Sequence, residues 1–491
     1  MSTFSRSIFW LSLSEIIFNV AGYVIHSAMG RILGPSDYGR FGLVVTLTTM
    51  IIVLIGNGIP TAMSKYLSEA FEAMPEKIYG IKRAAARLQI VLMGSVTIIF
   101  FFMAPILASL LNDPNLTPLF RLSSLIIPAF AAASFNAFFF TGLHFFKIQA
   151  LLKISRALAR ILFITLFGYY FGVQGAISGY IAAPFVVFII GLIIERLTVK
   201  RQFPEAHATR ATSVFPTRTI FAFAWPVTLF LLFYEFILTL DLYFVKAMLG
   251  SDYLTGIYNA AITVGRIPYY LFYALALIMI PTISKMNAER APQETTHFLT
   301  KALRLLVLLL FPMIALLVAF APELLTFFYG NRFLEATQTM QIYSIGVGFL
   351  TIFYILAFAL NGAGQSRVPM KLTLVGVFGI ILLNLYFIPR YQIVGAALAT
   401  TLVAAILMIL VLMYTERHFR IKIPFRLAFF SLIGSWGIVL LAPSVPREGG
   451  YFLISGAILA LGHFVFLGLS RSLSQDDRAE FQRIWGLFKR R

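Results

Sequence analysis

Long apolar runs alternate with short polar breaks along the whole chain. A helix needs about 20 apolar residues to cross the hydrocarbon core of a bilayer, and we count fourteen such runs in succession. The polar breaks hold a few to roughly twenty residues each, so none has room for a folded aqueous domain. The pattern predicts an all-α integral membrane protein with fourteen transmembrane helices.

Composition supports this prediction. Of the 491 residues, 59% are hydrophobic and 12% are charged, and the mean hydropathy is +0.87. A soluble domain is about half apolar and a quarter charged. The first apolar run extends to about Gly30, which is too long for the apolar part of a signal peptide. We therefore interpret it as the first span.

The net charge of +19 does not indicate a nucleic-acid partner. Most Lys and Arg residues gather at every second break, on the side of the membrane that the N-terminus shares. This is the positive-inside pattern, and it predicts cytoplasmic N- and C-termini. Topology together with attraction to anionic membrane lipids explains most of the positive charge. The main cationic segments are 65–87, 147–160, 196–218 and 285–304.

The chain contains an internal repeat. IPTAMSKYLSEA at Ile59 returns as IPTISKMNAER at Ile280, each with a proline closing an apolar run and a Ser-Lys pair after it. Four more landmarks recur in order, 215 to 220 residues apart. These are Asp37 and Asp252, Ala104-Pro105 and Ala321-Pro322, Gly142 and Gly362, and Gly175 and Gly395.

Five ordered landmarks at nearly one displacement predict two six-helix halves. Because six is even, both halves enter the membrane in the same sense, as parallel repeats related by an axis along the membrane normal. Such an arrangement is typical of transporters that alternate access to a central site. The predicted domains are an N-terminal bundle 1–200, a cytoplasmic linker 201–216, a C-terminal bundle 217–416, two extra spans 417–470 and a cytoplasmic amphipathic tail 471–491.

Three stretches carry a resemblance to a known family. LGPSDYGRFGL, GIPTAMSKYLSEA and APELLTFFYGNRFLEAT resemble the polysaccharide transporter family of the multidrug/oligosaccharidyl-lipid/polysaccharide exporter superfamily. The resemblance covers essentially the whole chain. It implies a flippase, without a cofactor, that moves an undecaprenyl-pyrophosphate-linked oligosaccharide from the cytoplasmic to the outer leaflet. It also implies the inner (plasma) membrane of a prokaryote as the location. Glycan polymerases or glycosyltransferases of the same pathway are the implied partners.

Glu235 and Arg266 are the first candidate site residues. Ionisable groups within spans are costly and often functional. At ~1.5 Å per residue the two lie at nearly equal depth, about 20 Å from the outer end of consecutive spans. Arg266 is then expected to bind the lipid pyrophosphate, because a guanidinium suits phosphate and stays charged when buried. The alternative is an ion pair that only joins the two helices.

Two intramembrane carboxylates are candidates for ion coupling. Glu15 and Asp241 can each bind a proton or a sodium ion, and Asn19 lies one helical turn from Glu15 on the same face. The alternative is that each carboxylate pairs with a cation, for example Arg31 or Lys246.

A cationic face is the third candidate. Lys153, Arg156 and Arg160 follow each other at i, i+3 and i+7, which places them on one side of a helix near its cytoplasmic end. One interpretation is side chains that extend to the headgroups. The other is a cationic entrance that gathers pyrophosphate headgroups from the inner leaflet.

Other classes of function fit the sequence less well. The chain has no cysteine, and its six histidines lack ligand spacing, so we expect no metal site and no enzyme. A cation-coupled multidrug exporter of the same fold is the main alternative to the flippase, because it too needs intramembrane carboxylates. An integral-membrane glycosyltransferase or polymerase is a weaker one, since the predicted outer loops are short.

Overall fold

The computed structural model describes residues 3–56, 58–70, 74–202, 217–470 and 472–473. Most of the predicted linker 201–216 and the predicted tail 471–491 lie outside this range. The described chain is helical and divides into two compact units, residues 1–259 and 260–491. Within the described residues, nine helices are long and apolar enough to cross a membrane.

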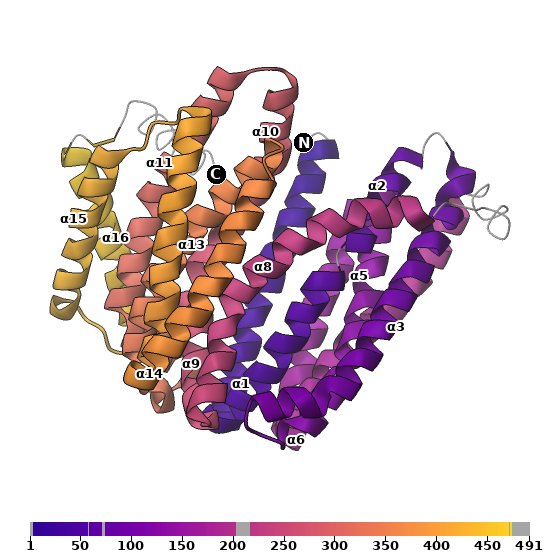
Figure 1. The fold of residues 1–491 in the computed structure, drawn as a ribbon, viewed down its shortest axis with the longest axis horizontal. Helices are drawn as coiled ribbons and strands as arrows, with labels where there is room; N and C mark the ends of the chain where they lie inside the picture. The colour runs from indigo at the N-terminus through magenta and orange to yellow at the C-terminus, as the bar shows by residue number, and fades with distance from the viewer. Residues whose placement is uncertain (1–2, 57, 71–73, 203–216, 471, 474–491) are drawn as a thin grey trace. The chain divides into compact units, whose positions relative to one another are not determined.

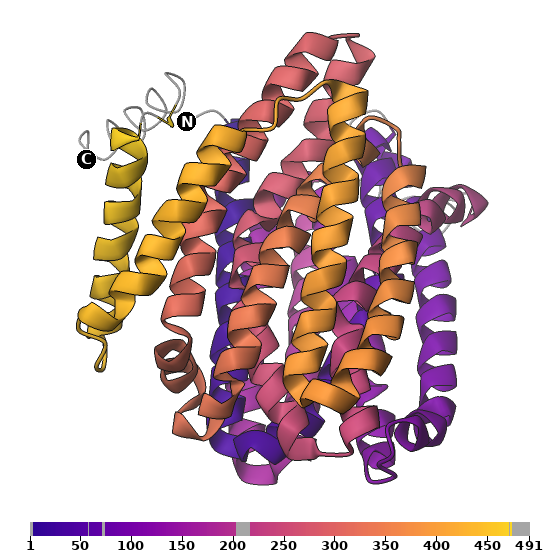
Figure 2. The ribbon, with the colours of Figure 1, turned by 60° about the vertical axis from the view of Figure 1, so that its left-hand side comes forward.

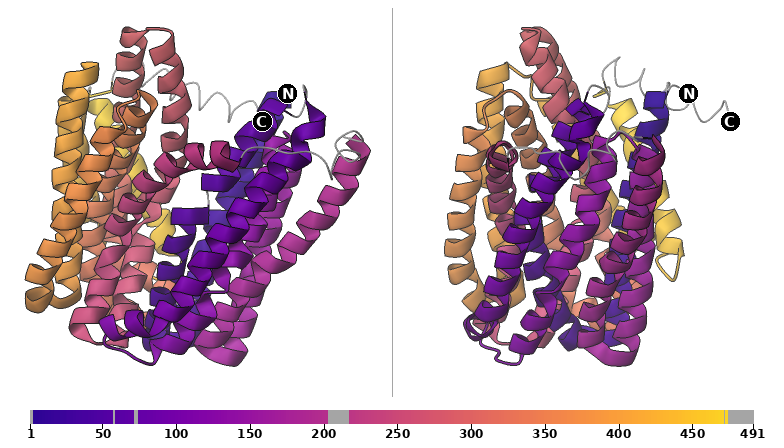
Figure 3. Two further views of the ribbon diagram at one scale, coloured as in Figure 1. Left: turned by 45° about the vertical axis from the view of Figure 1, so that its right-hand side comes forward. Right: turned by 90° about the vertical axis from the view of Figure 1, so that its right-hand side faces the viewer.

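In the part of the chain that the structure describes, the first unit contains seven complete α-helices and the first part of α9 (Figures 1 and 3). In chain order they are α1 (Thr3–Gly56), α2 (Gly58–Ala70), α3 (Ile78–Leu110), α4 (Leu116–Ser123), α5 (Ile126–Gly142), α6 (Phe146–Gln202), α8 (Thr217–Leu249) and α9 (Asp252–Gly265), with a 3-10 turn at Pro75–Lys77. The helix α1 packs mainly against α6, and α5 packs against α2 and α6.

The second unit is built around one buried helix. Nearly every residue of α13 from Gly346 to Gly362 is buried, and α10, α11 and α14 pack against it. The hairpin of α15 and α16 packs against α11 (Figure 2). The elements are α10 (Ile267–Ala288), α11 (Pro292–Ala319), α12 (Ala321–Tyr329), α13 (Thr337–Gly362), α14 (Arg367–Phe419), α15 (Phe425–Leu441) and α16 (Tyr451–Leu469), with 3-10 turns at Asn331–Ala336 and Ala442–Ser444.

Three of the nine membrane helices are too long for one crossing. The candidate spans 146–198 and 367–419 have 53 residues each, or about 80 Å of helix against a hydrocarbon core of about 30 Å. Each is interrupted by residues with non-helical backbone angles, at Gly172 in α6 and at Gln392 in α14. In α1 the interruption falls at Gly34, just before Pro35. These points separate consecutive spans that the apolar pattern predicts.

The sequence repeat has a local structural counterpart. The breaks at Gly172 and Gln392 are 220 residues apart, the same displacement as the two glycine landmarks. The helices α5 and α13 both end in the same way. The amide of Phe145 donates to the carbonyl of Phe140, and that of Gln365 donates to Leu360, each after a left-handed residue. This is the Schellman ending that stops a helix without leaving its last carbonyls unpaired.

The twin Ser-Lys phrases occupy matching places. A methyl group on Gly142 would lie 2.9 Å from the backbone of Ser64, so α2 and α5 touch backbone to backbone there. In the second unit, the hydroxyl of Ser284 donates to the carbonyl of Gly362 at 2.8 Å. Each phrase therefore packs against the end of the helix that carries the twin glycine, and its role is one of packing.

One predicted landmark pair does not occupy matching places. Pro105 lies inside α3, before that helix ends at Leu110, whereas Pro322 lies in the first turn of α12. A proline is tolerated in a first turn, where its missing N–H is not needed, but not inside an ordinary soluble helix. Within a membrane helix, neighbouring groups can compensate. The Ala-Pro dipeptide therefore lies in two different local structures.

The close contact at Gly142 can be tested. The substitution Gly142→Ala should lower the free energy of unfolding by about 1–3 kcal/mol, because the new methyl group must displace the backbone of α2. Gly94→Ala is the matched control, since a methyl there meets nothing within 4 Å and should be neutral or stabilising by up to ~1 kcal/mol. Thermal unfolding in detergent measures both variants. Equal stability of the two would contradict the contact.

Candidate functional site

The three cations predicted to share a face of α6 converge on a single phenyl ring. Because α1 packs along α6, the ring of Phe18 lies against them. The Nζ atom of Lys153 lies 5.4 Å from the ring centroid, and the guanidinium carbons of Arg156 and Arg160 lie 5.0 and 4.9 Å from it. We call Glu15, Phe18 and these three cations the Phe18 cluster. The π face of the ring attracts each cation and holds the three together despite their like charge.

Neighbouring helices supply polar partners to the cluster. The Nζ of Lys153 donates to Glu15 Oε1 on α1. An Nη of Arg156 donates to the Ser134 hydroxyl at 3.1 Å, and one of Arg160 donates to the Tyr180 hydroxyl at 3.3 Å. These contacts fix each cation to a different element: α1, α5 and the second segment of α6.

The Phe18 cluster has more positive than negative charge. Its three cations face one carboxylate, and Arg156 is only 8% exposed. The Nε atoms of Arg156 and Arg160 are buried and donate to no group that the structure describes. Buried charges are normally paired, and a buried donor without an acceptor is costly. The cluster therefore has the donor set and the charge of a site for an anion.

This geometry distinguishes the two interpretations of the cationic face. Side chains that extend to lipid headgroups keep the charged end in water. Here Arg156 is buried and the Lys153 side chain is 14% exposed, so both turn into the helix packing. The arrangement favours an internal cationic site over headgroup anchoring for these two residues.

The carboxylates predicted for ion coupling have partners other than those considered from sequence. Glu15 pairs with Lys153 and thus belongs to the cationic site. Asn19, one turn along α1, is half-buried. Asp241 on α8 is fully buried, and its oxygens accept hydrogen bonds from the Tyr258 hydroxyl at 2.6 Å and from the Leu242 amide at 2.8 Å.

Lys246 belongs to a second ionic cluster, at the predicted outer end of the first unit. Its side chain is 2% exposed and its Nζ contacts Asp252 and, at 2.9 Å, Asp113. Asp252 also accepts from Arg40 Nε at 2.7 Å. Sequence reasoning used Asp252 only as a repeat landmark and did not select Asp113. Part of this cluster could have been predicted from the sequence, because a buried lysine at the end of a span needs a nearby carboxylate.

Arg266 lies at the junction of α9 and α10, where the helix is interrupted. Its Nε donates to the Tyr343 hydroxyl on α13 at 2.8 Å, and its guanidinium lies 5.8 Å from that ring. Tyr269 and Tyr273 follow it along α10, and both rings contact Tyr354 of α13. Glu235 belongs to the first unit, whereas Arg266 belongs to the second. Their pairing therefore stays a prediction.

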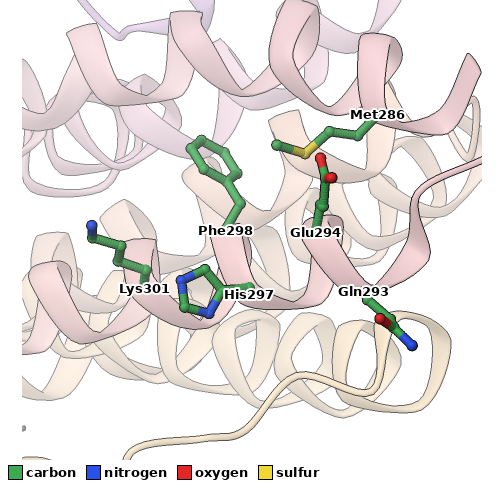
Figure 4. Close-up of a pocket in the computed structure, with 6 residues that line it drawn as sticks. All are labelled: Met286, Gln293, Glu294, His297, Phe298 and Lys301. Carbon is green, nitrogen blue, oxygen red and sulfur yellow. The ribbon is translucent and has the colours of Figure 1, made fainter. Parts of the chain in front are cut away.

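A shallow, open pocket lies at the turn between α10 and α11 (Figure 4). It holds about 490 Å³ and is lined by Met286, Gln293, Glu294, His297, Phe298 and Lys301. Met286 is 20 residues from Arg266 on the same helix, or about 30 Å away, so the pocket is not part of the Arg266 site. Among the described residues, no group of three or more His, Asp or Glu side chains is placed to hold a metal ion.

The second ionic cluster generates a prediction about pH. Burial raises the pKa of the Asp113 carboxyl, but the hydrogen bond and charge of Lys246, helped by the Asn115 amide and Arg40, outweigh burial and hold this pKa below its usual value. A lowered pKa in the folded state stabilises the fold above the usual value of about 3.9 and stops doing so as pH falls through the lowered value. Unfolding temperature should therefore drop as pH falls from about 5 to about 3.

The variant Asp113→Asn should lose part of that pH dependence and, at neutral pH, roughly 1.5–3 kcal/mol of stability, because Lys246 loses a charged hydrogen-bond partner. Asp37→Asn is the control, since Asp37 is 49% exposed and lies 3.7 Å from Arg40; exposed pairs contribute little. Thermal unfolding of both variants across pH measures the effect. An Asp113→Asn protein as stable as Asp37→Asn would contradict it.

The same chain matches known proteins along most of its length. The sequence profile of the family described as polysaccharide biosynthesis protein matches residues 4–287, more than half of the chain, and the MatE profile matches residues 226–387. Stage V sporulation protein B of Bacillus subtilis is 22% identical over 431 residues, which cover 81% of this chain and 80% of that protein. Succinoglycan biosynthesis transport protein ExoT of Rhizobium meliloti is 24% identical over 370 residues, covering 74% and 70%.

Solved structures share the fold. Lipid II flippase MurJ in an inward closed conformation superposes with a TM-score of 0.73, at 16% identity, over 94% of this chain and 98% of that one. An inward-facing MATE multidrug transporter of the MOP superfamily gives a TM-score of 0.72, at 14% identity, over 84% and 98%. These findings confirm the resemblance that the sequence carries: the chain belongs to the polysaccharide biosynthesis protein family.

Proposed function

We propose that the protein is a flippase that moves an undecaprenyl-pyrophosphate-linked oligosaccharide from the cytoplasmic to the outer leaflet by alternating access. The observation that supports this most is the Phe18 cluster, because an anionic headgroup is the cargo that its unpaired buried donors suit. Relatives named for succinoglycan transport and lipid II flipping point in the same direction. In this proposal fourteen spans form two parallel bundles plus two extra helices, with both termini in the cytoplasm of a prokaryotic cell.

The chemistry of the cluster fits a pyrophosphate. A guanidinium offers parallel N–H donors that match two oxygens of a phosphate, and it cannot lose its charge when buried. Arg156 and Arg160 each direct one nitrogen to a hydroxyl and keep the buried Nε for another acceptor. A phosphate that accepts hydrogen bonds from both Nε groups would give these two donors an acceptor. The donors would in turn replace the water that the headgroup loses when it enters the site.

The direction of entry follows from the order of residues along α6. Lys153 is nearest the predicted cytoplasmic end, and Arg160 lies seven residues further in, about 10 Å deeper. A headgroup that enters from the inner leaflet would meet the cations in that order. The energy source in this proposal is an ion gradient or the membrane potential. The candidate carriers of H⁺ or Na⁺ are Asp241, which is fully buried and hydrogen-bonded, and Glu15, with Asn19 one helical turn away as a candidate ligand.

The runner-up is a cation-coupled multidrug exporter. The MATE structure of similar fold and the buried carboxylate of Asp241 favour it. A cationic drug, however, would be repelled by a cluster with three cations and one carboxylate. The flippase accounts for that excess of positive charge, and the exporter does not.

A transport assay tests the proposal. Liposomes containing the protein and a fluorescent undecaprenyl-pyrophosphate oligosaccharide report its arrival in the other leaflet. Arg156→Gln and Arg160→Gln should each slow flipping roughly tenfold to a hundredfold, since a hydrogen bond to a charged group contributes about 1.5–3 kcal/mol. Arg156→Lys should recover part of the rate, because it keeps the charge but loses the two-point contact.

The matched control is Arg390→Gln. Arg390 also lies over an aromatic ring, 3.9 Å from Tyr386, but it is exposed on the surface of α14. Its replacement should leave flipping unchanged. Normal flipping by correctly folded Arg156→Gln and Arg160→Gln proteins would exclude the cluster as the phosphate site.

A second prediction concerns Arg266, which we propose as a further phosphate ligand held by Glu235 when cargo is absent. Arg266→Ala should abolish flipping in a folded protein, and Arg266→Lys should restore it in part. If the pair only joins two helices, the double variant Glu235→Gln with Arg266→Gln should keep a hydrogen-bonded contact and flip normally. The same liposome assay measures all three variants, and near-normal flipping by the double variant would contradict phosphate binding by Arg266.

A further inference from the structure

Among the described residues, Glu15 is the one carboxylate of the Phe18 cluster. It pairs with Lys153, across 138 residues of sequence. The two partners differ in exposure: the Lys153 side chain is 14% exposed and the Glu15 side chain is 42% exposed. The ammonium is thus enclosed by protein, while the carboxylate reaches it from a more open position.

We propose that Glu15 is an exchangeable internal anion that occupies the place of the cargo phosphate on Lys153 and competes with it. This inference rests on the proposed function and adds a regulatory step to the same site. When cargo arrives, its phosphate displaces the carboxylate from Lys153. When cargo leaves, the carboxylate returns and prevents the phosphate from binding again.

The difference in exposure explains why the carboxylate is the partner that moves. A charged group that leaves its ion pair gives up the contacts around it, and this cost is smaller for a side chain that is nearly half exposed than for one that protein encloses. Arg156 is buried, with Nη bonded to Ser134, and Lys153 is confined against the Phe18 ring. The cations therefore stay in place, and only the anion can be exchanged.

Like-charge repulsion explains why the two anions compete. All three cations lie within 5.4 Å of one ring centroid, so a phosphate bound by Arg156 and Arg160 lies beside the carboxylate on Lys153. Two anions on adjacent cations in a poorly hydrated site repel each other strongly. The carboxylate relieves this repulsion when it turns away from Lys153 and the phosphate.

The exchange of Glu15 with the phosphate also gives a physical reason for release of the lipid headgroup. A site with three cations and no internal anion would hold a pyrophosphate tightly, and tight binding in both leaflets slows transport. An internal carboxylate tethered to the same protein has a high effective concentration at the site. It can therefore replace a bound headgroup once the site opens to the outer leaflet.

The test measures affinity and turnover together. The purified full-length protein is titrated with undecaprenyl pyrophosphate that carries one N-acetylglucosamine, and flipping of the same lipid is followed in liposomes. Glu15→Gln should bind this lipid roughly tenfold more tightly, within the range of ordinary coupling between sites. At saturating lipid it should flip more slowly than the unmodified protein, because release is impaired.

Two further variants separate exchange on Lys153 from a general effect of removing negative charge. In a Lys153→Gln background, Glu15→Gln should no longer tighten binding, since the two anions have lost the cation for which they compete. Glu69→Gln is the matched control: Glu69 pairs with Lys65 at 3.8 Å on the exposed face of α2 and should change neither affinity nor rate. If Glu15→Gln fails to fold, Glu15→Asp should shift affinity in the same direction, because the shorter arm reaches Lys153 less well.

The results of these measurements test the exchange role of Glu15 and the flippase proposal separately. Unchanged or weaker lipid binding by folded Glu15→Gln, or equal tightening with and without Lys153, overturns the exchange. The flippase proposal fails by a different result, namely no binding of the lipid to the unmodified protein or full binding by Arg156→Gln. If the lipid binds, Arg156→Gln weakens it and Glu15→Gln leaves it unchanged, the proposed function stands and the exchange role does not.

Discussion

Positive charge enclosed within a membrane helix bundle must have negative charge beside it, and this constraint connects the features of the first unit. Three cations on one face of α6 would repel each other and resist burial. The ring of Phe18 and the hydroxyls of Ser134 and Tyr180 supply partial negative charge, and Glu15 supplies one full charge. What is still missing is the acceptor for two buried guanidinium Nε groups. The proposed cargo, with its phosphate headgroup, would supply that acceptor.

The helices that meet this constraint are held by features that recur in both units. The helix breaks at Gly172 and Gln392 and the Schellman endings of α5 and α13 keep one displacement of 220 residues. The repeated Ser-Lys phrase packs against the end of one such helix in each unit. The charges, in contrast, do not follow the repeat. The Phe18 cluster lies in the first unit and Arg266 in the second, so the two proposed phosphate sites do not follow the repeat.

Much of the fold could be predicted from the sequence, because the length of an apolar run is a strong signal in a membrane protein. The separation of spans at Gly34-Pro35 and the helical class follow from local residues alone. Relations between distant residues could not be predicted in this way. The contact of Glu15 with Lys153 depends on the packing of α1 on α6. From the sequence we predicted different roles for the two residues, ion coupling for Glu15 and phosphate binding for Lys153.

Phe18 illustrates the same limit. A phenylalanine in an apolar helix has nothing in its sequence context that marks it, and only the packing of three cations around its ring identifies it. Lys246 was considered as a partner for an intramembrane carboxylate, and the structure gives it Asp113 and Asp252. For charged residues, the sequence predicts that a partner is needed. The partner's identity is a property of the tertiary structure.

The central claim is that the Phe18 cluster binds the pyrophosphate of the cargo, and an experimental structure with bound lipid tests it most directly. A cryo-electron microscopy map of the protein with undecaprenyl-pyrophosphate oligosaccharide should place a phosphate within hydrogen-bond distance of the Nε groups of Arg156 and Arg160. In that map the Glu15 side chain should be turned away from Lys153. A pyrophosphate bound elsewhere, with Glu15 still on Lys153 and both Nε groups without an acceptor, would contradict it.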